Sequence, residues 1–299
     1  RKAVMEDRCA LVPNLQPMLV DGVYPFYAGV FDGHNGCLAA EIAAAQLHAR
    51  LAETPELPSR TEAEVQAALL RAFAATEDAV NAATEEEGKQ DGTTALVVVV
   101  IGKTLYVANV GDTRAVLGWV HEEGKKPQLR AERLSVDHKP DTALEKRRVE
   151  MAGGGVEFSG CWRVSHEDIP MRLAVARSLG DRAFKDEKLV PSSASDSSKM
   201  HKVQLVSPVP NIRIRKLGPK DKFIILATDG LWDVVDDAQA VRLAGELLLP
   251  PGLAGEVAGG AAADEPLQVA AERLVQAALD AGAADNVTAA VVGLHWDYR

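Results

Sequence analysis

Residues 94–110 have the sequence TALVVVVIGKTLYVANV and hold the clearest structural signal in this 299-residue chain. Two apolar runs, 94–101 and 105–110, are rich in Val and show no alternation with polar residues. Such runs are typical of strands that are covered on both faces. Gly102 and Lys103 separate them with turn chemistry, which indicates a hairpin. The stretch therefore predicts two antiparallel strands inside a layered fold.

Similar apolar runs and several helical patterns extend this interpretation over the chain. Further short runs of the strand type occupy residues 27–31, 223–227 and 289–294. A capping box, Thr61-x-x-Glu64, begins one helical pattern, Asp236-Asp237 precedes a second, and Pro266 lies in the first turn of a third. Each helix has one apolar stripe that must be buried against a sheet. We expect an α+β fold with two packed, mainly antiparallel sheets and helices outside them.

Three segments lack these patterns and are expected to form mobile loops within a single domain spanning residues 1–299. They cover about 153–169, 185–210 and 250–264, and they are rich in Gly, in Ser with Lys and Pro, and in Gly with Ala, respectively. The first of them follows a helix that we expect to end at Ala152.

Charge and composition exclude several classes of protein. The chain has 33 basic and 43 acidic residues, a net charge of −10. A nucleic-acid or membrane surface is disfavoured, because both are bound mainly through an excess of Lys and Arg. No apolar run approaches the roughly 20 residues that a bilayer needs.

The cysteines and the first residues give an expectation about compartment. Cys9, Cys37 and Cys161 are odd in number and show no C-x-x-C spacing, so neither a disulfide framework nor a zinc site is indicated. This favours an intracellular location, in the cytoplasm or nucleus. Because the chain opens on Arg1-Lys2 without Met, we expect it to begin inside a longer protein, which leaves organelle import open.

Acidic residues recur where the apolar runs end. Asp32 and Asp229 each end a run and precede Gly, Asp112 ends another, Asp285 precedes the last, and Glu6 precedes the first predicted strand. A single Asp-Gly pair usually marks only a turn. If three carboxylates meet within about 5 Å, each pair repels by about 3 kcal/mol at an effective dielectric constant near 20. Oxygen ligands favour hard divalent ions, so a two-metal hydrolytic centre is our hypothesis.

The acids also belong to a series of eight motifs that resembles the type 2C protein phosphatases, the metal-dependent serine/threonine phosphatases. In order, the motifs are MED (5–7), FDGHNG (31–36), DGTTA (91–95), VGDTRA (110–115), DHKP (137–140), LAVARSLGD (173–181), ATDGLWDV (227–234) and DNVT (285–288). The series spans essentially the whole chain. The resemblance implies a four-layer α-β-β-α sandwich that hydrolyses phosphoserine and phosphothreonine in proteins with a metal-activated water, without a phosphoenzyme.

The resemblance further implies two Mn²⁺ or Mg²⁺ ions in a cleft at one end of the sandwich. Asp32 would bridge both ions and the Gly33 carbonyl would bind one of them. Glu6, Asp229 and Asp285 would hold the other ion, directly or through water.

Other motif positions receive supporting roles from the same resemblance. Asp7 would orient a water on a metal, and Asp112 and Asp233 match positions associated with a weaker third ion. His34 would be the general acid that protonates the leaving oxygen. Asp181 closes a motif but is assigned no direct metal contact.

The residue that holds the substrate phosphate stays open. The family usually places Arg three residues before the Met of its first motif, whereas this chain has Lys2 there with Arg1 beside it. Either residue could bind the phosphate, although Lys offers a point charge in place of a bidentate fork.

Alternative interpretations concern both single residues and the whole chain. We interpret His138-Lys139-Pro140 as a structural loop, followed by a charged run, 145–148, on a solvated helix face. Trp162 either contacts protein substrate or packs. We expect the chain to be a monomer and to act on phosphorylated proteins. The alternative is a catalytically impaired phosphatase fold that serves as a binding module in signalling.

Overall fold

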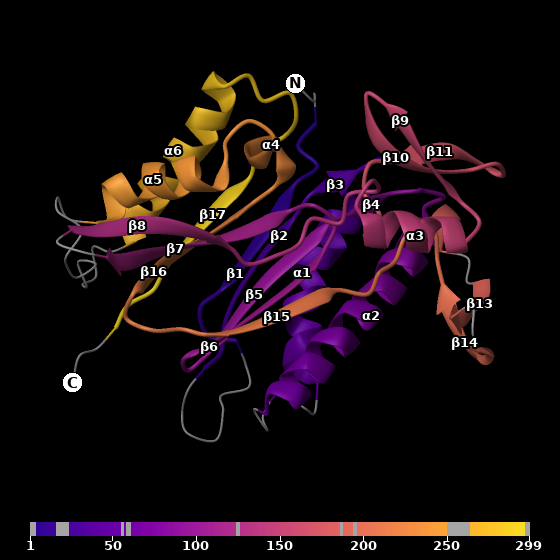
Figure 1. The fold of residues 1–299 in the computed structure, drawn as a ribbon, viewed down its shortest axis with the longest axis horizontal. Coiled ribbons are helices and arrows are strands. Elements are labelled where there is room, and N and C mark those ends of the chain that lie inside the picture. Colours follow the sequence, from indigo (N-terminus) through magenta and orange to yellow (C-terminus); the bar gives the residue numbers. More distant parts are fainter. Residues whose placement is uncertain are drawn as a thin grey trace.

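The computed structural model describes residues 4–15, 24–54, 57, 61–123, 126–185, 188–193, 196–249 and 264–296. Two antiparallel sheets lie at its centre, with helices on their outer faces (Figure 1). The first sheet has the order β1 (Arg8–Val12), β2 (Phe26–Phe31), β5 (Ala95–Ile101), β6 (Thr104–Val110) and β15 (Asn211–Lys216). The second has the order β17 (Ala289–Gly293), β16 (Asp221–Ala227), β7 (Arg114–Glu123) and β8 (Lys126–Arg133).

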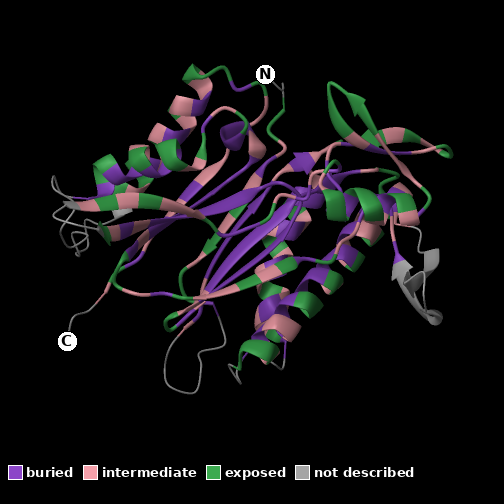
Figure 2. Cartoon of the chain, viewed as in Figure 1, coloured by how far each residue is buried: buried purple, intermediate pink, exposed green. Residues whose placement is uncertain are grey.

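The hairpin predicted for residues 94–110 is confirmed as β5 and β6, which pair from Ala95↔Val110 to Ile101↔Thr104. The directions of the β5 side chains explain why its apolar residues do not alternate with polar ones. Leu96 and Val98 point into the space between the two sheets, where they join apolar residues of β7 and β16. Val97 and Val99 point the other way, toward the helices. Both faces of β5 are buried, as the purple strands of Figure 2 show.

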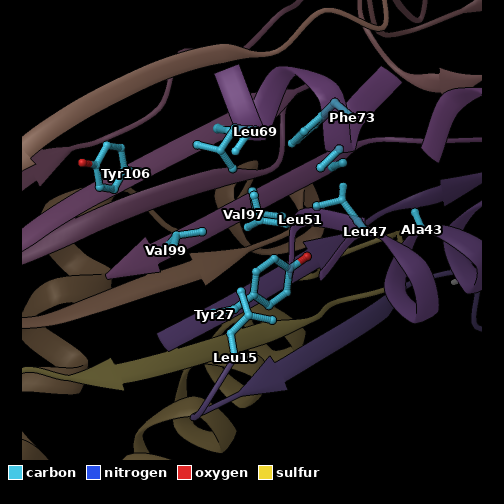
Figure 3. Close-up of a cluster of buried hydrophobic side chains, with 14 of the residues drawn as sticks. Leu15, Tyr27, Ala43, Leu47, Leu51, Leu69, Phe73, Val97, Val99 and Tyr106 are labelled. Atoms are coloured by element: carbon cyan, nitrogen blue, oxygen red, sulfur yellow. The ribbon is translucent and has the colours of Figure 1, made fainter. Parts of the chain in front are cut away.

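Helices cover the outer face of each sheet. The pair α1 (Leu38–Glu53) and α2 (Glu62–Glu86) packs on the first sheet, and Figure 3 shows the side chains that fill this contact. The pair α5 (Asp237–Leu248) and α6 (Asp264–Asp280) packs on the second. The predicted α-β-β-α order of layers is therefore confirmed. No helix of the described residues is long and apolar enough to cross a membrane.

Two helices begin where the sequence predicts, and in both a side chain next to the first turn caps the helix. Thr61 accepts a hydrogen bond from the Glu64 amide at 3.3 Å, and its hydroxyl donates to the Glu64 carboxylate. Asp236 accepts from the Gln239 amide at 2.7 Å. These contacts satisfy backbone donors that the first turn of a helix leaves open.

Helix α1 is absent from the predicted elements, although its Ala- and Leu-rich stretch favours a helix. What the sequence alone does not show is its cap, which comes from far along the chain. Cys37 precedes the helix without a side-chain capping bond. The Leu38 amide instead donates to the Asp91 carboxylate at 3.0 Å. A cap from a residue 53 positions away leaves no local signal.

Two of the three segments expected to form loops contain strands, so the expectation of irregular backbone is wrong for those parts. Residues 153–169 lie mainly in a small antiparallel sheet of β9 (Gly155–Ser159), β10 (Cys161–His166) and β11 (Ile169–Leu173), which we call the flap sheet. Val164 of this sheet packs with Val149 of α3 (Ala143–Met151), and this burial holds the sheet in place. Within 185–210, β13 (Lys188–Ser193) pairs with β14 (Asp196–Val203). Residues 250–263 lie outside the described residues.

The predicted solvated run on α3 is also partly wrong. Glu145 is buried and accepts hydrogen bonds from Arg148 at 2.9 Å and from Arg177 at 2.6 Å. Two guanidinium groups compensate the buried carboxylate and hold its pKa below its usual range, although burial alone would raise it. Helix α3 is thus tied to the motif at 173–181, which contains Arg177.

The DHKP loop supplies a prediction about stability. His138 is 2% exposed, its amide donates to the Gly111 carbonyl at 3.0 Å, and its carbonyl accepts from Ala176 at 2.8 Å. Burial, aided by the charge of Arg177, lowers the pKa of His138 from 6.5 to about 4. Between about pH 4 and pH 6.5, His138 is protonated in the unfolded chain but neutral in the folded chain. The stability that depends on neutral His138 is therefore present above pH 6.5 and is lost as pH falls toward 4.

We expect the native chain to lose about 2 kcal/mol more unfolding free energy between pH 7 and pH 5 than His138→Gln does. Urea unfolding of both proteins at the two pH values measures the difference. Parallel pH profiles for the two proteins would contradict this account of His138.

Candidate functional site

The motifs from the two ends of the chain meet at one end of the sandwich, near β3 and α4 in Figure 1. The Glu6 amide donates to Asn286 Oδ1 at 2.9 Å, and Thr228 Oγ1 donates to Asp7 Oδ2 at 3.1 Å. These hydrogen bonds join residues 280 and 221 positions apart. They place the first motif beside the segments that carry Asp229 and Asp285.

The second motif is fixed to the same place. Asp32 follows β2, and its amide donates to Thr94 Oγ1 at 3.0 Å while its carbonyl accepts from the Thr94 amide at 2.9 Å. Gly33 begins β3 (Gly33–His34), and a Cβ atom there would lie 2.5 Å from the Glu6 carbonyl oxygen. Only glycine permits this approach, which brings Glu6 against the turn after Asp32.

Asp229 begins α4 (Asp229–Trp232), immediately after β16. The segment before it is joined to the last motif, since the Thr228 amide donates to the Thr288 carbonyl and the Thr288 amide to Thr228 Oγ1, both at 3.1 Å. The neighbouring strands β16 and β17 therefore hold Asp229 and Asp285 at the same end of the second sheet.

Burial and mutual repulsion dominate the electrostatics of these acids. Burial, together with the charges of Asp112, Asp233 and Asp285, raises the pKa of Asp229 to about 7. Burial also raises the pKa of Asp112, against the opposing effect of Lys139. Several carboxylates thus lie close enough to disfavour each other's charged forms.

Lys139 is a member of this cluster that sequence reasoning missed. Its Nζ lies 3.6 Å from Asp112 Oδ2 and 3.4 Å from Asp233 Oδ1. The interpretation of the DHKP loop as purely structural therefore fits His138 but not Lys139. The sequence did carry a signal, because Lys139 lies in the DHKP motif of the same series that contains Asp112 and Asp233.

A cavity of about 330 Å³ opens over the acids. Asp112, Asp229, Asp233 and Lys139 form one part of its lining, and residues of the flap sheet form another. The flap contributes Phe158 and Trp162, whose rings contact edge to face at 5.5 Å, and Cys161 between them in the chain. Trp162 is 40% exposed and faces the cavity rather than the core.

His34 has a buried acidic partner that sequence reasoning also missed. Its Nε2 lies 2.8 Å from Asp181 Oδ2, and Asp181 is completely buried. The contact joins positions 147 residues apart, so no local spacing announces it.

The donor chemistry of the site fits hard divalent cations. The predicted ligands offer carboxylate and carbonyl oxygens only. The raised pKa of Asp229 shows that its negative charge is disfavoured in this cluster, and a bound cation would offset that charge. Within the described part of the chain, no three His, Cys, Asp or Glu side chains already converge as metal ligands. Arg1 and Lys2, the two candidates for binding the substrate phosphate, lie outside the described residues.

Comparisons with known proteins agree with the motif series. The family model Protein phosphatase 2C matches residues 1–287. A probable protein phosphatase 2C 52 of Oryza sativa is 33% identical over 297 residues, which is 99% of this chain and 49% of that protein. A probable protein phosphatase 2C 76 of Arabidopsis thaliana is 31% identical over 99% of this chain and 57% of its own length. The chain thus spans about half the length of these relatives.

Solved structures share the fold. The serine-threonine phosphatase 2C from Toxoplasma gondii aligns with a TM-score of 0.75 and 25% identity, covering 98% of this chain and 91% of that one. A sex-determining protein of C. elegans aligns with a TM-score of 0.71 at 23% identity, over 98% of this chain and 62% of that one, which shows the fold alone. With a family match over residues 1–287, the chain belongs to the protein phosphatase 2C family.

Proposed function

We propose that this chain hydrolyses phosphoserine and phosphothreonine esters of proteins in the acidic cavity at the end of its sandwich. The observation that carries the proposal is the half-buried carboxylate Asp229, whose pKa is raised to about 7 by burial and by the charges of Asp112, Asp233 and Asp285. Such a cluster is costly for the fold and is typical of a cation site. Family membership supports the reaction class.

The cluster and the motifs around it would hold two Mn²⁺ or Mg²⁺ ions. Asp32 would bridge them, the Gly33 carbonyl would bind one, and Glu6, Asp229 and Asp285 would bind the other. When bound, the ions neutralise charge on the phosphoryl oxygens and activate the attacking water. Asp7, which accepts a hydrogen bond from Thr228, would orient that water.

The side chain that acts on the leaving group is His34. Serine and threonine alkoxides are poor leaving groups, so a proton must reach the ester oxygen as its bond to phosphorus breaks. His34 follows the Asp32-Gly33 turn directly and is 22% exposed, which lets it reach a bound substrate. Lys2 or Arg1 would hold the phosphate oxygens.

A weaker third ion would bind at Asp112 and Asp233. Lys139 contacts both of these carboxylates, so this ion would have to compete with the lysine ammonium. The exposed rings of Phe158 and Trp162 would contact the phosphorylated protein beside the cavity.

Metal dependence is the first prediction. We expect Mn²⁺-dependent release of phosphate from a phosphothreonine peptide, abolished by EDTA and reduced at least about 100-fold in Asp229→Asn, since the ligand charge is lost. Asp141→Asn is the matched control, because Asp141 lines the same cavity and is not a proposed ligand. Phosphate release is measured with each protein at saturating Mn²⁺.

A folded chain without metal-dependent activity would contradict the proposal and favour the binding module instead. Activity that persists in EDTA, or an equal loss in Asp141→Asn, would contradict the assignment of the ligands.

The role of His34 gives a second prediction. His34→Ala should lower turnover of the phosphothreonine peptide by about 100-fold or more, the range of general acid catalysis. Turnover of p-nitrophenyl phosphate should fall much less, because its leaving group needs little protonation. His48→Ala serves as a control for a histidine on α1, away from the motif. Equal losses on the two substrates would remove His34 from the acid role.

A further inference from the structure

We infer that Asp181 is a positioning residue that fixes the imidazole ring of His34 for proton transfer. The inference rests on the proposed function and adds to it a residue for which the motif series supplies no role. Asp181 Oδ2 lies 2.8 Å from His34 Nε2. Asp181 is fully buried whereas the His34 side chain is 22% exposed, so the carboxylate lies behind the ring, away from solvent.

The carboxylate is itself held in one orientation. Ser178 Oγ donates to the same Oδ2 oxygen at 2.5 Å. The other oxygen, Oδ1, is buried and has no hydrogen-bond partner among the described residues. An unsatisfied buried polar atom costs about 1–3 kcal/mol, so a carboxylate kept here with one oxygen unsatisfied and the other on His34 and Ser178 points to function rather than stability.

The backbone is built around this contact. Asp181 has φ +55°, a left-handed conformation that non-glycine residues adopt at a cost. Its amide donates to the Asp91 carbonyl at 3.1 Å. A Cβ atom on Gly92 would lie 2.2 Å from Asp181 Oδ2, so only glycine at this position leaves room for the carboxylate.

Three short strands set the two partners side by side. Gly92, in β4 (Gly92–Thr93), pairs with His34 of β3 on one side and with Gly180 of β12 (Leu179–Gly180) on the other. Asp181 directly follows β12. The small sheet therefore places the His34 ring and the Asp181 carboxylate on either side of β4. Backbone hydrogen bonds between the strands fix their relative geometry.

A carboxylate only accepts hydrogen bonds, so Nε2 of His34 must carry a proton when it faces Asp181. This fixes both the tautomer and the direction of the ring, as an acidic partner does for other catalytic histidines. The nitrogen that serves the leaving oxygen is then Nδ1, and the form that acts as the acid is the imidazolium: Nδ1 gives its proton to the leaving oxygen while Nε2 keeps the proton that it donates to Asp181. Without Asp181 the ring would rotate, and proton transfer would suffer more than substrate binding.

The test compares Asp181→Asn and Asp181→Ala with the native chain. The side-chain amide of asparagine can turn its NH2 group, a donor, toward His34 Nε2. Alanine removes the carboxylate acceptor altogether. We expect kcat on the phosphothreonine peptide to fall about 10- to 100-fold with KM changed less than about 3-fold, and kcat on p-nitrophenyl phosphate to fall less than about 3-fold. Added to His34→Ala, either change should cause no further loss.

Asp91→Asn is the matched control, because Asp91 is also a buried carboxyl beside the small sheet but caps α1 through the Leu38 amide. It should lower thermal stability and leave the ratio of the two substrate activities unchanged. Equal losses on both substrates for the Asp181 variants, unchanged activity, or losses additive with His34→Ala would overturn the inference.

A second measurement does not depend on variants that fold. In the native Mg²⁺-loaded chain at pH 8, ¹⁵N NMR of the imidazole groups, with His34 assigned by its loss in His34→Ala, should show the proton on Nε2. A proton on Nδ1, or a rapidly averaged ring, would overturn the inference. If the native chain shows no metal-dependent activity, the proposed function fails, whereas the NMR result still decides the ring contact.

Discussion

Repulsion among crowded carboxylates is the constraint around which this end of the molecule is built. Asp229 is half-buried beside Asp112, Asp233 and Asp285, and burial together with the charges of these neighbours raises its pKa to about 7. A fold accepts such a cost only if something of opposite charge offsets it. Lys139 does so for Asp112 and Asp233. Hard divalent cations would do so for the remaining acids.

The sandwich brings these acids together through its connectivity. Strands β2 and β16 belong to different sheets, yet Asp32 and Asp229 follow them at the same end of the layers. Hydrogen bonds between motifs then fix the positions, as from Glu6 to Asn286 and from Thr228 to Asp7. The apolar core between the sheets therefore serves the site by holding the ends of its strands in register.

Sequence patterns predicted the elements whose signals are local. The apolar runs of β5 and β6 and the caps at Thr61 and Asp236 needed no distant partner. Helix α1 was missed although its Ala-rich composition favours a helix, and only its cap, Asp91, is non-local. The flap sheet was missed because its short strands gain their stability by packing on α3. Within the site, the acids ending strands were visible as a series. The pairings of His34 with Asp181 and of Lys139 with two aspartates arise only in three dimensions.

The central claim is that acids from distant parts of the chain share a pair of hard cations. Equilibrium binding of Mn²⁺ to the purified chain, followed by the EPR signal of the free ion, measures this without reference to catalysis. We expect two tightly bound ions per chain, apart from the weaker third ion, and loss of both in Asp32→Asn, because that carboxylate would bridge them. Saturation with fewer than two ions, or unchanged binding in Asp32→Asn, would contradict the central claim.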